Sequence, residues 1–270
     1  MIGLILFVFL PSSINGTSFG LRESYQLLAV NLSIWSSLIF YYHRDIRALF
    51  LLVLVIYVVS LLHVVFIIFG AVLIGMLFVC SAARSFRIKT SSLVPILALG
   101  SVAVILGFSG PLFGLIGANP DLSPIGAILS FQEGSVNTGL LSRATYKFAV
   151  PIEVGGLGSI TYFFVGFFQY LFEPMPWKIS SILDVMLTIE NIIRGIMIYL
   201  GIRAFFNVNE DDKKIILILL TSYLAVEFAW SLGTTNWGTA QRHHIPTLGL
   251  LFLIGLTYRD SIKKEANANS

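Results

Sequence analysis

The sequence predicts an all-α fold, a polytopic bundle of transmembrane helices, and three observations support this class. Of its 270 residues, 56% are hydrophobic and only 11% are charged, whereas a soluble globular protein carries roughly 25% charged residues. The mean hydropathy is +0.88, and several apolar runs are longer than the ~18 residues needed to cross a bilayer. These features exclude a soluble enzyme, a nucleic-acid-binding protein and a disordered chain.

The apolar runs predict about seven to nine membrane segments in a single integral membrane domain that covers residues 1–270. The segments are expected near residues 27–42, 48–80, 93–108, 158–172, 189–206, 215–232 and 245–258. The run at 48–80 is too long for one upright helix, because a helix rises only about 1.5 Å per residue. We expect either two short helices that meet around Leu62–Ile68 or one strongly tilted helix.

The region 109–157 differs from the rest of the chain, because prolines, glycines and charged residues interrupt its apolar pieces. Backbone that is not helical is tolerated at membrane depth only where protein or water satisfies its polar groups. We therefore expect a polar loop with short interfacial or re-entrant helices.

The first ten residues, Met1–Leu10, lack a positively charged segment and a small-residue cleavage site, so we expect no cleaved signal peptide. They are too short to span a membrane unaided, and they look like the end of a helix in a shortened member of a longer group. The single cysteine, Cys80, excludes an internal disulfide and a multi-cysteine metal site. No motif calls for a metal or a cofactor.

Short loops rich in Lys and Arg indicate the cytoplasmic side of a multi-pass protein. The hydrophilic C-terminal tail, the turn Asp211–Lys214 and the stretch Arg84–Lys89 all carry such residues. We therefore expect a cytoplasmic C-terminus, with Gly233–His244 and Pro174–Trp177 on the outer face. This assignment requires that Gly158–Phe172 is re-entrant or that the region 109–157 hides one more crossing.

The strongest candidate for a functional site is Gly233–His244, where Arg242, His243 and His244 precede an apolar helix. A guanidinium can bond two oxygens of a phosphate or carboxylate at once, and the start of a helix also favours an anion. A polar turn with an anchoring arginine explains the composition about equally well. The adjacent histidines are a weak metal signal, since neighbours on a helix point about 100° apart.

Other ionisable groups near membrane depth are weaker candidates. Glu227 is an isolated carboxylate that must be protonated or find a partner, such as an arginine of the next segment. Glu190 and Arg194 share a helix face and favour a structural ion pair. Arg143 and Lys147 would share a face if helical, and either contact headgroups or bind an anionic substrate. His63 is read as a hydrogen-bonded core residue, and the Glu173–Trp177 segment as an interfacial turn.

Two stretches resemble large bacterial membrane proteins of surface-polysaccharide assembly. Tyr170–Ile179 (YLFEPMPWKI), followed by Glu190, is similar to a phenylalanine–x–proline–x–proline–tryptophan region of that group. Asn236–His243 (NWGTAQRH), immediately before a final hydrophobic helix, is similar to a glycine–threonine–x–arginine–histidine region. The resemblance covers residues 157–255 and points to O-antigen or exopolysaccharide polymerases and multi-spanning glycosyltransferases, which usually have more membrane segments than this chain.

The resemblance implies transfer of a sugar from a lipid-pyrophosphate carrier at the outer face of the bacterial inner membrane. Arg242 would neutralise the leaving pyrophosphate, His243 would accept the proton of the acceptor hydroxyl, and Glu227 would orient Arg242 or act as an alternative base. Substrate contacts would come from Arg143, Lys147, Asn236 and Trp177. The expected partners are the lipid-linked glycan, membrane lipids and other polysaccharide-assembly proteins, with no nucleic acid.

Two other function classes remain open from the sequence. A transporter or flippase of a lipid-linked or anionic substrate often has inverted internal repeats, and the sequence shows no convincing repeat. A scaffold without chemistry of its own would tolerate changes at Arg242 and Glu227, but not on the small-residue faces of its helices.

Overall fold

The protein is a bundle of helices in the computed structural model, which describes residues 22–115, 126, 128–130, 132, 134 and 157–256. The helices are α3 (Arg22–His43), α4 (Ile46–Leu62), α5 (Val65–Ser85), α6 (Thr90–Leu115), α8 (Leu157–Phe172), α9 (Ile182–Asn207), α10 (Glu210–Ser231) and α11 (Trp237–His244). Two short 3-10 helices, η1 (Pro176–Lys178) and η2 (Ile245–Thr247), are also present, and residues 248–256 are α-helical. No β-strand occurs in the described ranges, so the all-α prediction is confirmed for them.

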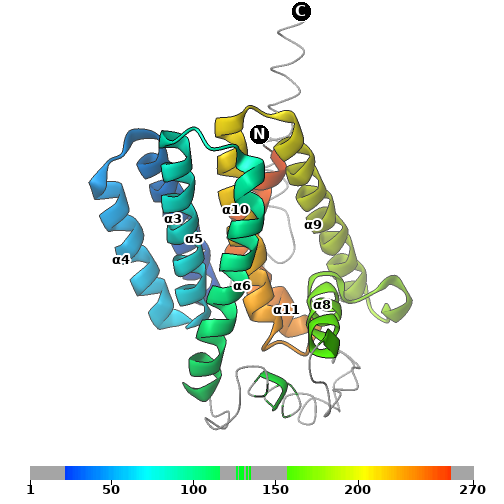
Figure 1. The fold of residues 1–270 in the computed structure, drawn as a ribbon. Helices are drawn as coiled ribbons and strands as arrows, with labels where there is room; N and C mark the ends of the chain where they lie inside the picture. The colour runs from blue at the N-terminus through cyan, green and yellow to red at the C-terminus, as the bar shows by residue number, and fades with distance from the viewer. Residues whose placement is uncertain are drawn as a thin grey trace, which may run out of the picture.

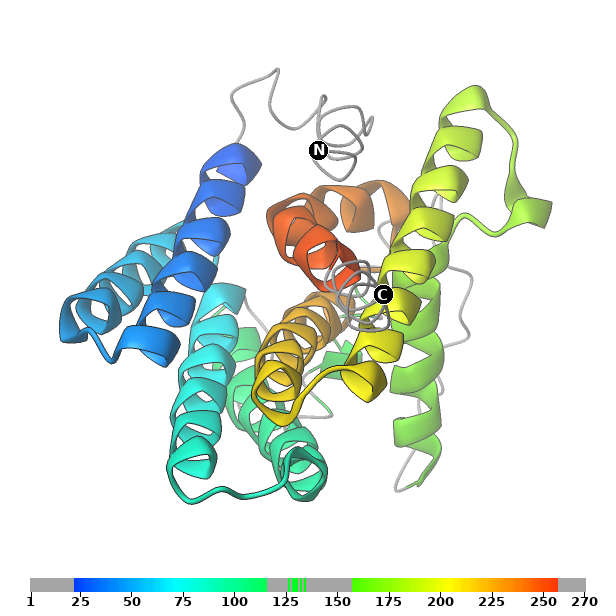
Figure 2. The same cartoon turned by 90° about the horizontal axis from the view of Figure 1, so that it is seen from above.

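Most helices run between two ends of the bundle (Figure 1). The turns between α3 and α4, between α5 and α6 and between α9 and α10 lie together at one end, which we call the basic end. The start of α3, the α4–α5 junction, the start of α9 and α11 lie at the opposite end, which we call the α11 end. The helix α8 runs across the bundle, since Figure 1 shows it nearly end-on and Figure 2 shows it lengthwise.

The helix α10 is the centre of the bundle, and it packs against α5, α6, α8, α9 and α11. Its N-terminus is capped by Asn209, whose side chain accepts hydrogen bonds from the backbone N–H groups of Asp211 and Asp212. Buried residues occupy all sides of this helix (Ile215–Leu219, Tyr223, Ala225, Val226, Ala229, Trp230). A helix that is apolar all round is expected in the core of a membrane bundle.

Three described helices, α5, α9 and α10, are long and apolar enough to cross a membrane. Three shorter apolar helices, Ile46–Leu62, Thr90–Ile105 and Thr161–Phe172, accompany them. The described part of the chain therefore supplies three candidate spans, against about seven to nine expected from hydropathy.

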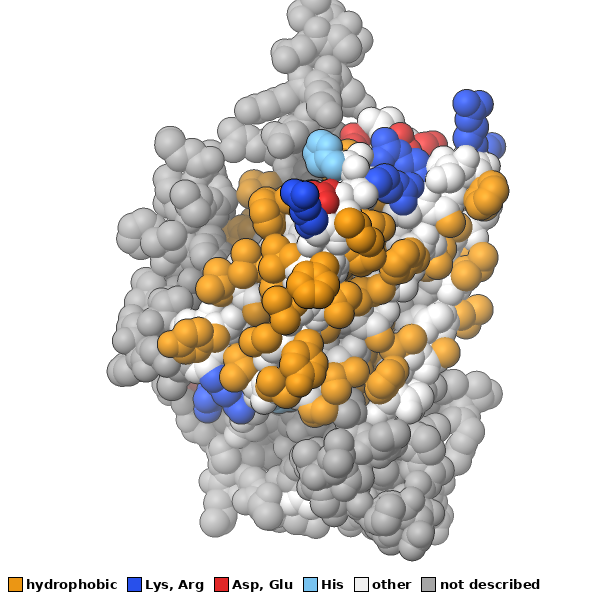
Figure 3. Space-filling model, turned by 90° about the vertical axis from the view of Figure 1, so that its left-hand side faces the viewer, with side chains coloured by type: hydrophobic (Ala, Val, Ile, Leu, Met, Phe, Trp, Pro, Cys, Tyr) orange, Lys and Arg blue, Asp and Glu red, His pale blue; other side chains and the backbone are white. Residues whose placement is uncertain are grey.

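The outward faces of the bundle are apolar, as lipid contact requires. Figure 3 shows a broad apolar band, with Lys and Arg side chains confined to its two margins. On α4 alone, Phe50, Tyr57 and Leu61 are each more than 60% exposed. In water such a patch is rare on a monomer, whereas in a bilayer it is the face that meets hydrocarbon, so the bundle has the surface of a membrane protein.

The long apolar run at 48–80 forms two helices, which meet at His63 and Val64. The break is stabilised locally, because the backbone N–H of Val65 donates to His63 Nδ1 at 3.3 Å. The run 245–258 starts as the 3-10 helix η2, where Pro246 occupies the first turn. Most of the region 109–157, together with residues 1–21 and the C-terminal tail, lies outside the described residues.

Candidate functional site

Buried polar side chains are concentrated toward the α11 end, where α8, α9, α10 and α11 pack together. The buried polar and charged residues of these elements and their connections include Glu173, Asp184, Glu190, Asn191, Arg194, Glu227, His244 and Thr247. Ionisable groups at membrane depth are expensive and usually functional. This cluster is therefore the first place to look for chemistry.

The deepest members of the cluster are Glu227 of α10 and His244 of α11, which form a hydrogen-bonded pair. Their Oε2 and Nδ1 atoms lie 2.6 Å apart, and Thr247 Oγ1 donates to the other carboxylate oxygen of Glu227. The second ring nitrogen of His244, Nε2, lies 3.2 Å from the carbonyl oxygen of Tyr170. A carbonyl can only accept a hydrogen bond, so Nε2 carries a proton.

The proton on Nε2 restricts the possible states of the pair. Either His244 is a cation that donates to an ionised Glu227, or Glu227 is protonated and donates to a neutral His244. In both states the pair holds one shared acidic proton between Nδ1 and Oε2 and has no net charge. Such a pair can occupy an apolar interior without the full cost of a buried ion.

Arg194 of α9 approaches the same pair and is itself buried. Its Nη1 atom donates to the carbonyl oxygen of Leu171 at 2.7 Å and to the side chain of Asn191. The sequence favoured an ion pair between Glu190 and Arg194, but Glu190 instead accepts a hydrogen bond from Gln241 of α11. These contacts connect α8, α9 and α11 through polar side chains.

Arg242 of α11 lies at the surface of the α11 end, where 54% of its side chain is exposed. Its Nη2 and Nε atoms donate to Oε1 of Glu23 at 2.8 and 3.2 Å, and the Glu23 side chain is only 3% exposed. The expectation that Glu227 orients Arg242 is therefore wrong, because Glu227 pairs with His244. Since the guanidinium has five N–H donors, several remain for an anion.

His243 points away from His244 and toward α5, as expected for neighbours on a helix. Its ring stacks on Trp230 at 5.4 Å between centroids and faces the His63 ring at 5.7 Å. Thr234 Oγ1 lies 3.0 Å from His243 Nδ1 and donates its only proton to the carbonyl oxygen of Trp230. His243 Nδ1 must therefore carry the proton of the neutral ring, which leaves Nε2 as the basic nitrogen.

Burial keeps both histidines of this aromatic group neutral. It lowers the pKa of His243 to about 3, and the neighbouring His63 adds to the effect. Burial likewise lowers the pKa of His63 to about 4, with a further contribution from the charge of Arg22. At neutral pH both rings are therefore neutral, and each has one unprotonated nitrogen.

The short helix α11 holds Arg242, His243 and His244 in fixed directions. Asn236 caps its N-terminus, accepting hydrogen bonds from the N–H groups of Gly238 and Thr239 at 2.7 and 3.3 Å. Asn236 is a typical N-cap residue, so the structure gives this predicted substrate ligand a structural task. Trp177, the other described candidate, lies on η1 with 79% of its surface exposed, as suits an interfacial anchor.

The remaining predicted ligands, Arg143 and Lys147, lie outside the described residues. Within the described ranges, no group of three or more His, Cys, Asp or Glu side chains could hold a metal ion. Cys80 is buried in α5 as a free thiol.

In comparisons with known proteins, no family model matches the chain, and no curated protein or solved structure is significantly similar to it.

Proposed function

We propose that the protein is a multi-pass membrane protein of cell-surface polysaccharide assembly that transfers or polymerises glycan units carried on a lipid pyrophosphate. The observation that carries this proposal is that an exposed arginine and a neutral histidine are neighbours on one short helix. Arg242 is tethered by Glu23 but remains half-exposed, and the next residue, His243, has a neutral ring with an unprotonated Nε2. The likeness of Asn236–His243 to polysaccharide polymerases supports the same reading.

The donors of Arg242 suit the pyrophosphate of the carrier lipid. Two of its N–H groups bind Glu23, which holds the guanidinium in one orientation. The remaining donors can bond phosphate oxygens as a fork. Because negative charge on the leaving pyrophosphate increases in the transition state, an arginine placed there accelerates the transfer.

The reaction assigned to the site is a displacement at the anomeric carbon of the donor sugar. The hydroxyl oxygen of the acceptor glycan forms a bond to that carbon, and the bond from the carbon to the pyrophosphate oxygen breaks. The pyrophosphate leaves with the electron pair, and the hydroxyl proton passes to His243 Nε2. Glu227 and His244 act as positioning residues that hold α11 against α8 and α10.

Orientation and partners follow from the charge distribution. The turns of the basic end hold Arg44, Arg47, Arg84, Arg87, Lys89, Lys213 and Lys214, whereas fewer described cations lie at the α11 end. Lys and Arg bias supports placing the basic end, with the C-terminus, in the cytoplasm of a bacterial inner membrane. The α11 end would then meet the lipid-linked glycan and other assembly proteins at the outer face.

The test is the surface glycan profile of a host that lacks this protein and is complemented with variants. Arg242→Ala is expected to leave single lipid-linked repeats in place of long chains, at normal protein level in the membrane. Arg242→Lys is expected to restore only part of the long chains, because lysine has no fork. Arg203→Ala removes an exposed arginine of α9 and serves as the control, with full restoration expected. Full activity of both Arg242 variants would contradict the proposal.

A proton-coupled transporter is the second candidate, and the buried Glu227–His244 pair favours it. A pair that shares one proton beside Arg194 is the kind of group found along proton pathways in membranes. In that case, Glu227→Gln would abolish uptake or export of the substrate, whereas Arg242→Ala would change mainly its affinity. Transport measured in proteoliposomes with an imposed proton gradient separates the two functions.

A further inference from the structure

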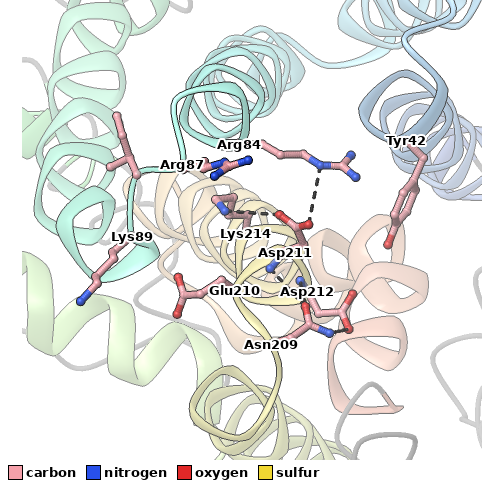
Figure 4. A pocket seen from close by; sticks show the side chains of 10 residues that line it. Tyr42, Arg84, Arg87, Lys89, Asn209, Glu210, Asp211, Asp212 and Lys214 are labelled. Atoms are coloured by element: carbon pink, nitrogen blue, oxygen red, sulfur yellow. Dashed lines mark hydrogen bonds and ion pairs between the residues drawn. The ribbon is translucent and has the colours of Figure 1, made fainter.

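At the basic end, a cavity of about 700 Å³ opens between the end of α3, the α5–α6 turn and the start of α10. Figure 4 shows its charged side chains, which include both cations and carboxylates. Its lining consists of Tyr42, Arg84, Arg87, Ile88, Lys89, Asn209, Glu210, Asp211, Asp212 and Lys214. The functional site proposed above lies at the opposite end of the bundle (Figure 1), so this cavity is separate from it.

The carboxylates of the cavity are already engaged by neighbouring groups. Glu210 accepts hydrogen bonds from the backbone and hydroxyl of Thr90 and pairs with Lys213. Asp211 lies between Arg84 and Lys214, at 3.8 and 3.4 Å. Asp212 accepts a hydrogen bond from the Asn209 amide at 2.9 Å.

Two cations of the cavity are not engaged in this way. Within the described part of the chain, the side chains of Arg87 and Lys89 form no hydrogen bond or ion pair. Arg84, in contrast, also donates to the carbonyl oxygen of Tyr41 and lies over its ring. The cavity thus combines three engaged carboxylates with two cations that have no partner in the described part of the chain, and the ligand it favours is an anion.

The backbone at Arg87 has a left-handed conformation that bears on the choice of a test variant. Its φ is 53°, in the left-handed region that glycine adopts most easily, and the turn is closed by a hydrogen bond from Ile88 N to Ala83 O at 2.9 Å. Glycine is the usual residue where a helix ends in this conformation. Arg44, at the end of α3, has the same conformation with φ 56°, and at either position glycine can replace arginine without backbone strain.

Apolar side chains flank the two cations in the sequence, and two of them, Tyr42 and Ile88, line the cavity. Phe86 and Ile88 of the α5–α6 turn are 77% and 42% exposed, and Tyr42 at the end of α3 is 50% exposed. An anion that reaches Arg87 and Lys89 therefore lies beside surface suited to hydrocarbon. This combination is characteristic of a lipid headgroup, whose phosphate lies directly above its acyl chains.

We propose that this cavity binds the phosphate of an anionic membrane phospholipid, with Arg87 and Lys89 as its ligands. A basic pocket between helices at one membrane face is the type of site that recognises anionic headgroups. The acyl chains would lie along the apolar surface of Phe86 and Ile88. The site concerns the lipid surroundings of the protein and does not depend on the function proposed above.

The experiment measures binding of phosphatidylglycerol to the full-length protein in detergent, by native mass spectrometry and by the shift in unfolding temperature. Arg87→Gly and Lys89→Gln are each expected to weaken binding about fivefold. Arg87→Gly should fold normally, because glycine accepts the left-handed backbone. Arg47→Gln is the matched control, since Arg47 is an exposed cation of the same end that does not line the cavity.

Four results would overturn the proposal. Arg87→Gly and Lys89→Gln could bind phosphatidylglycerol as tightly as the unmodified protein, or Arg47→Gln could weaken binding equally, which would indicate diffuse attraction. Phosphatidylcholine could bind as well as phosphatidylglycerol, so that charge plays no part. Inorganic phosphate could stabilise the protein as much as the lipid does, and the ligand would then be a free anion.

Discussion

Glu23 and Arg242 form a hydrogen-bonded ion pair across 219 residues of sequence, with 2.8 Å between Oε1 and Nη2. The carboxylate is buried and the guanidinium is half-exposed, so the pair joins the interior of the bundle to its surface. The start of α3 thereby fixes the orientation of the side chain that the proposed function uses to bind pyrophosphate. A change at Glu23 should affect activity although Glu23 itself touches no substrate.

Replacing Glu23 by Gln should separate this positioning effect from stability. The amide keeps one acceptor for Arg242 but loses the charge, and a half-exposed pair contributes only about 1 kcal/mol to the free energy of unfolding. We expect about a tenfold loss of glycan elongation with a small fall in the unfolding temperature. Arg47→Gln, at an exposed cation of the opposite end of the bundle, is the control, because Arg22 also pairs with Glu23 at 3.7 Å. Unchanged elongation in Glu23→Gln would contradict the positioning role.

The shared proton of Glu227 and His244 can be located by substitution. Glutamine at 227 can donate to His244 Nδ1 and accept from Thr247, so it mimics a protonated Glu227 and should cost about 1 kcal/mol. Glu227→Ala and His244→Ala leave a buried partner unpaired and should each cost about 3–5 kcal/mol. Unfolding in detergent, followed by tryptophan fluorescence, measures these differences. If Glu227→Gln lowers the free energy of unfolding as much as Glu227→Ala does, the pair is ionic.

Two substitutions distinguish a helix-capping role of Asn236 from a contact with substrate. Aspartate caps a helix as well as asparagine does, whereas Asn236→Ala removes the cap of α11 and should cost about 1 kcal/mol. If the residue is only a cap, Asn236→Asp keeps full elongation activity and Asn236→Ala loses part of it through stability. A stable but inactive Asn236→Asp protein would show instead that the amide contacts substrate.

The buried histidines make stability depend on pH. The pKa values of His63 and His243 are lowered to about 4 and about 3 in the folded protein, from about 6.5 in an unfolded chain. As pH falls from about 6.5, the unfolded chain binds protons that the folded protein excludes, so the free energy of unfolding decreases. The unfolding temperature should fall between pH 7 and pH 4.5. His63→Gln should show a shallower fall, and an equally steep one would exclude His63 as a contributor.

Close helix packing near the C-terminal end depends on Gly255. A Cβ atom there would lie 2.3 Å from Met197 Sδ and 3.1 Å from Met197 Cα, so Gly255→Ala forces α9 and the helical residues 248–256 apart. We expect a cost of about 1–3 kcal/mol. Gly75→Ala is the control, because a Cβ there meets nothing within 4 Å. Gly75→Ala should be neutral or slightly stabilising, because alanine favours a helix more than glycine does, and an equal loss in both variants would contradict the packing argument.

The sequence allowed the helical class to be predicted, because hydropathy and low charge are properties of whole segments. The alternative of two helices within 48–80 could be stated but not chosen, since the break at His63–Val64 contains neither proline nor glycine. The helix α8 could not be distinguished from a crossing segment. Its composition is as apolar as that of a span, and its direction is set by packing against α9 and α10.

Part of the candidate site was also within reach of the sequence. Arg242 and His243 stand out because ionisable residues at membrane depth are rare, and the structure places both on α11. Their partners were beyond sequence reasoning, because Glu23 lies 219 residues away. His244 was assigned no role, although it pairs with Glu227, because the rotation of α11 about its axis decides which histidine faces inward.

The crosswise helix α8 has a consequence for the lipids around the protein. With the bundle axis along the membrane normal, α8 covers a length of about 24 Å within one leaflet only. Its exposed residues, among them Phe164 and Phe168, occupy space there that lipids hold in the other leaflet. In the described part of the chain, α8 thus adds apolar surface at one level of the bundle, whereas α5, α9 and α10 distribute theirs along the bundle axis.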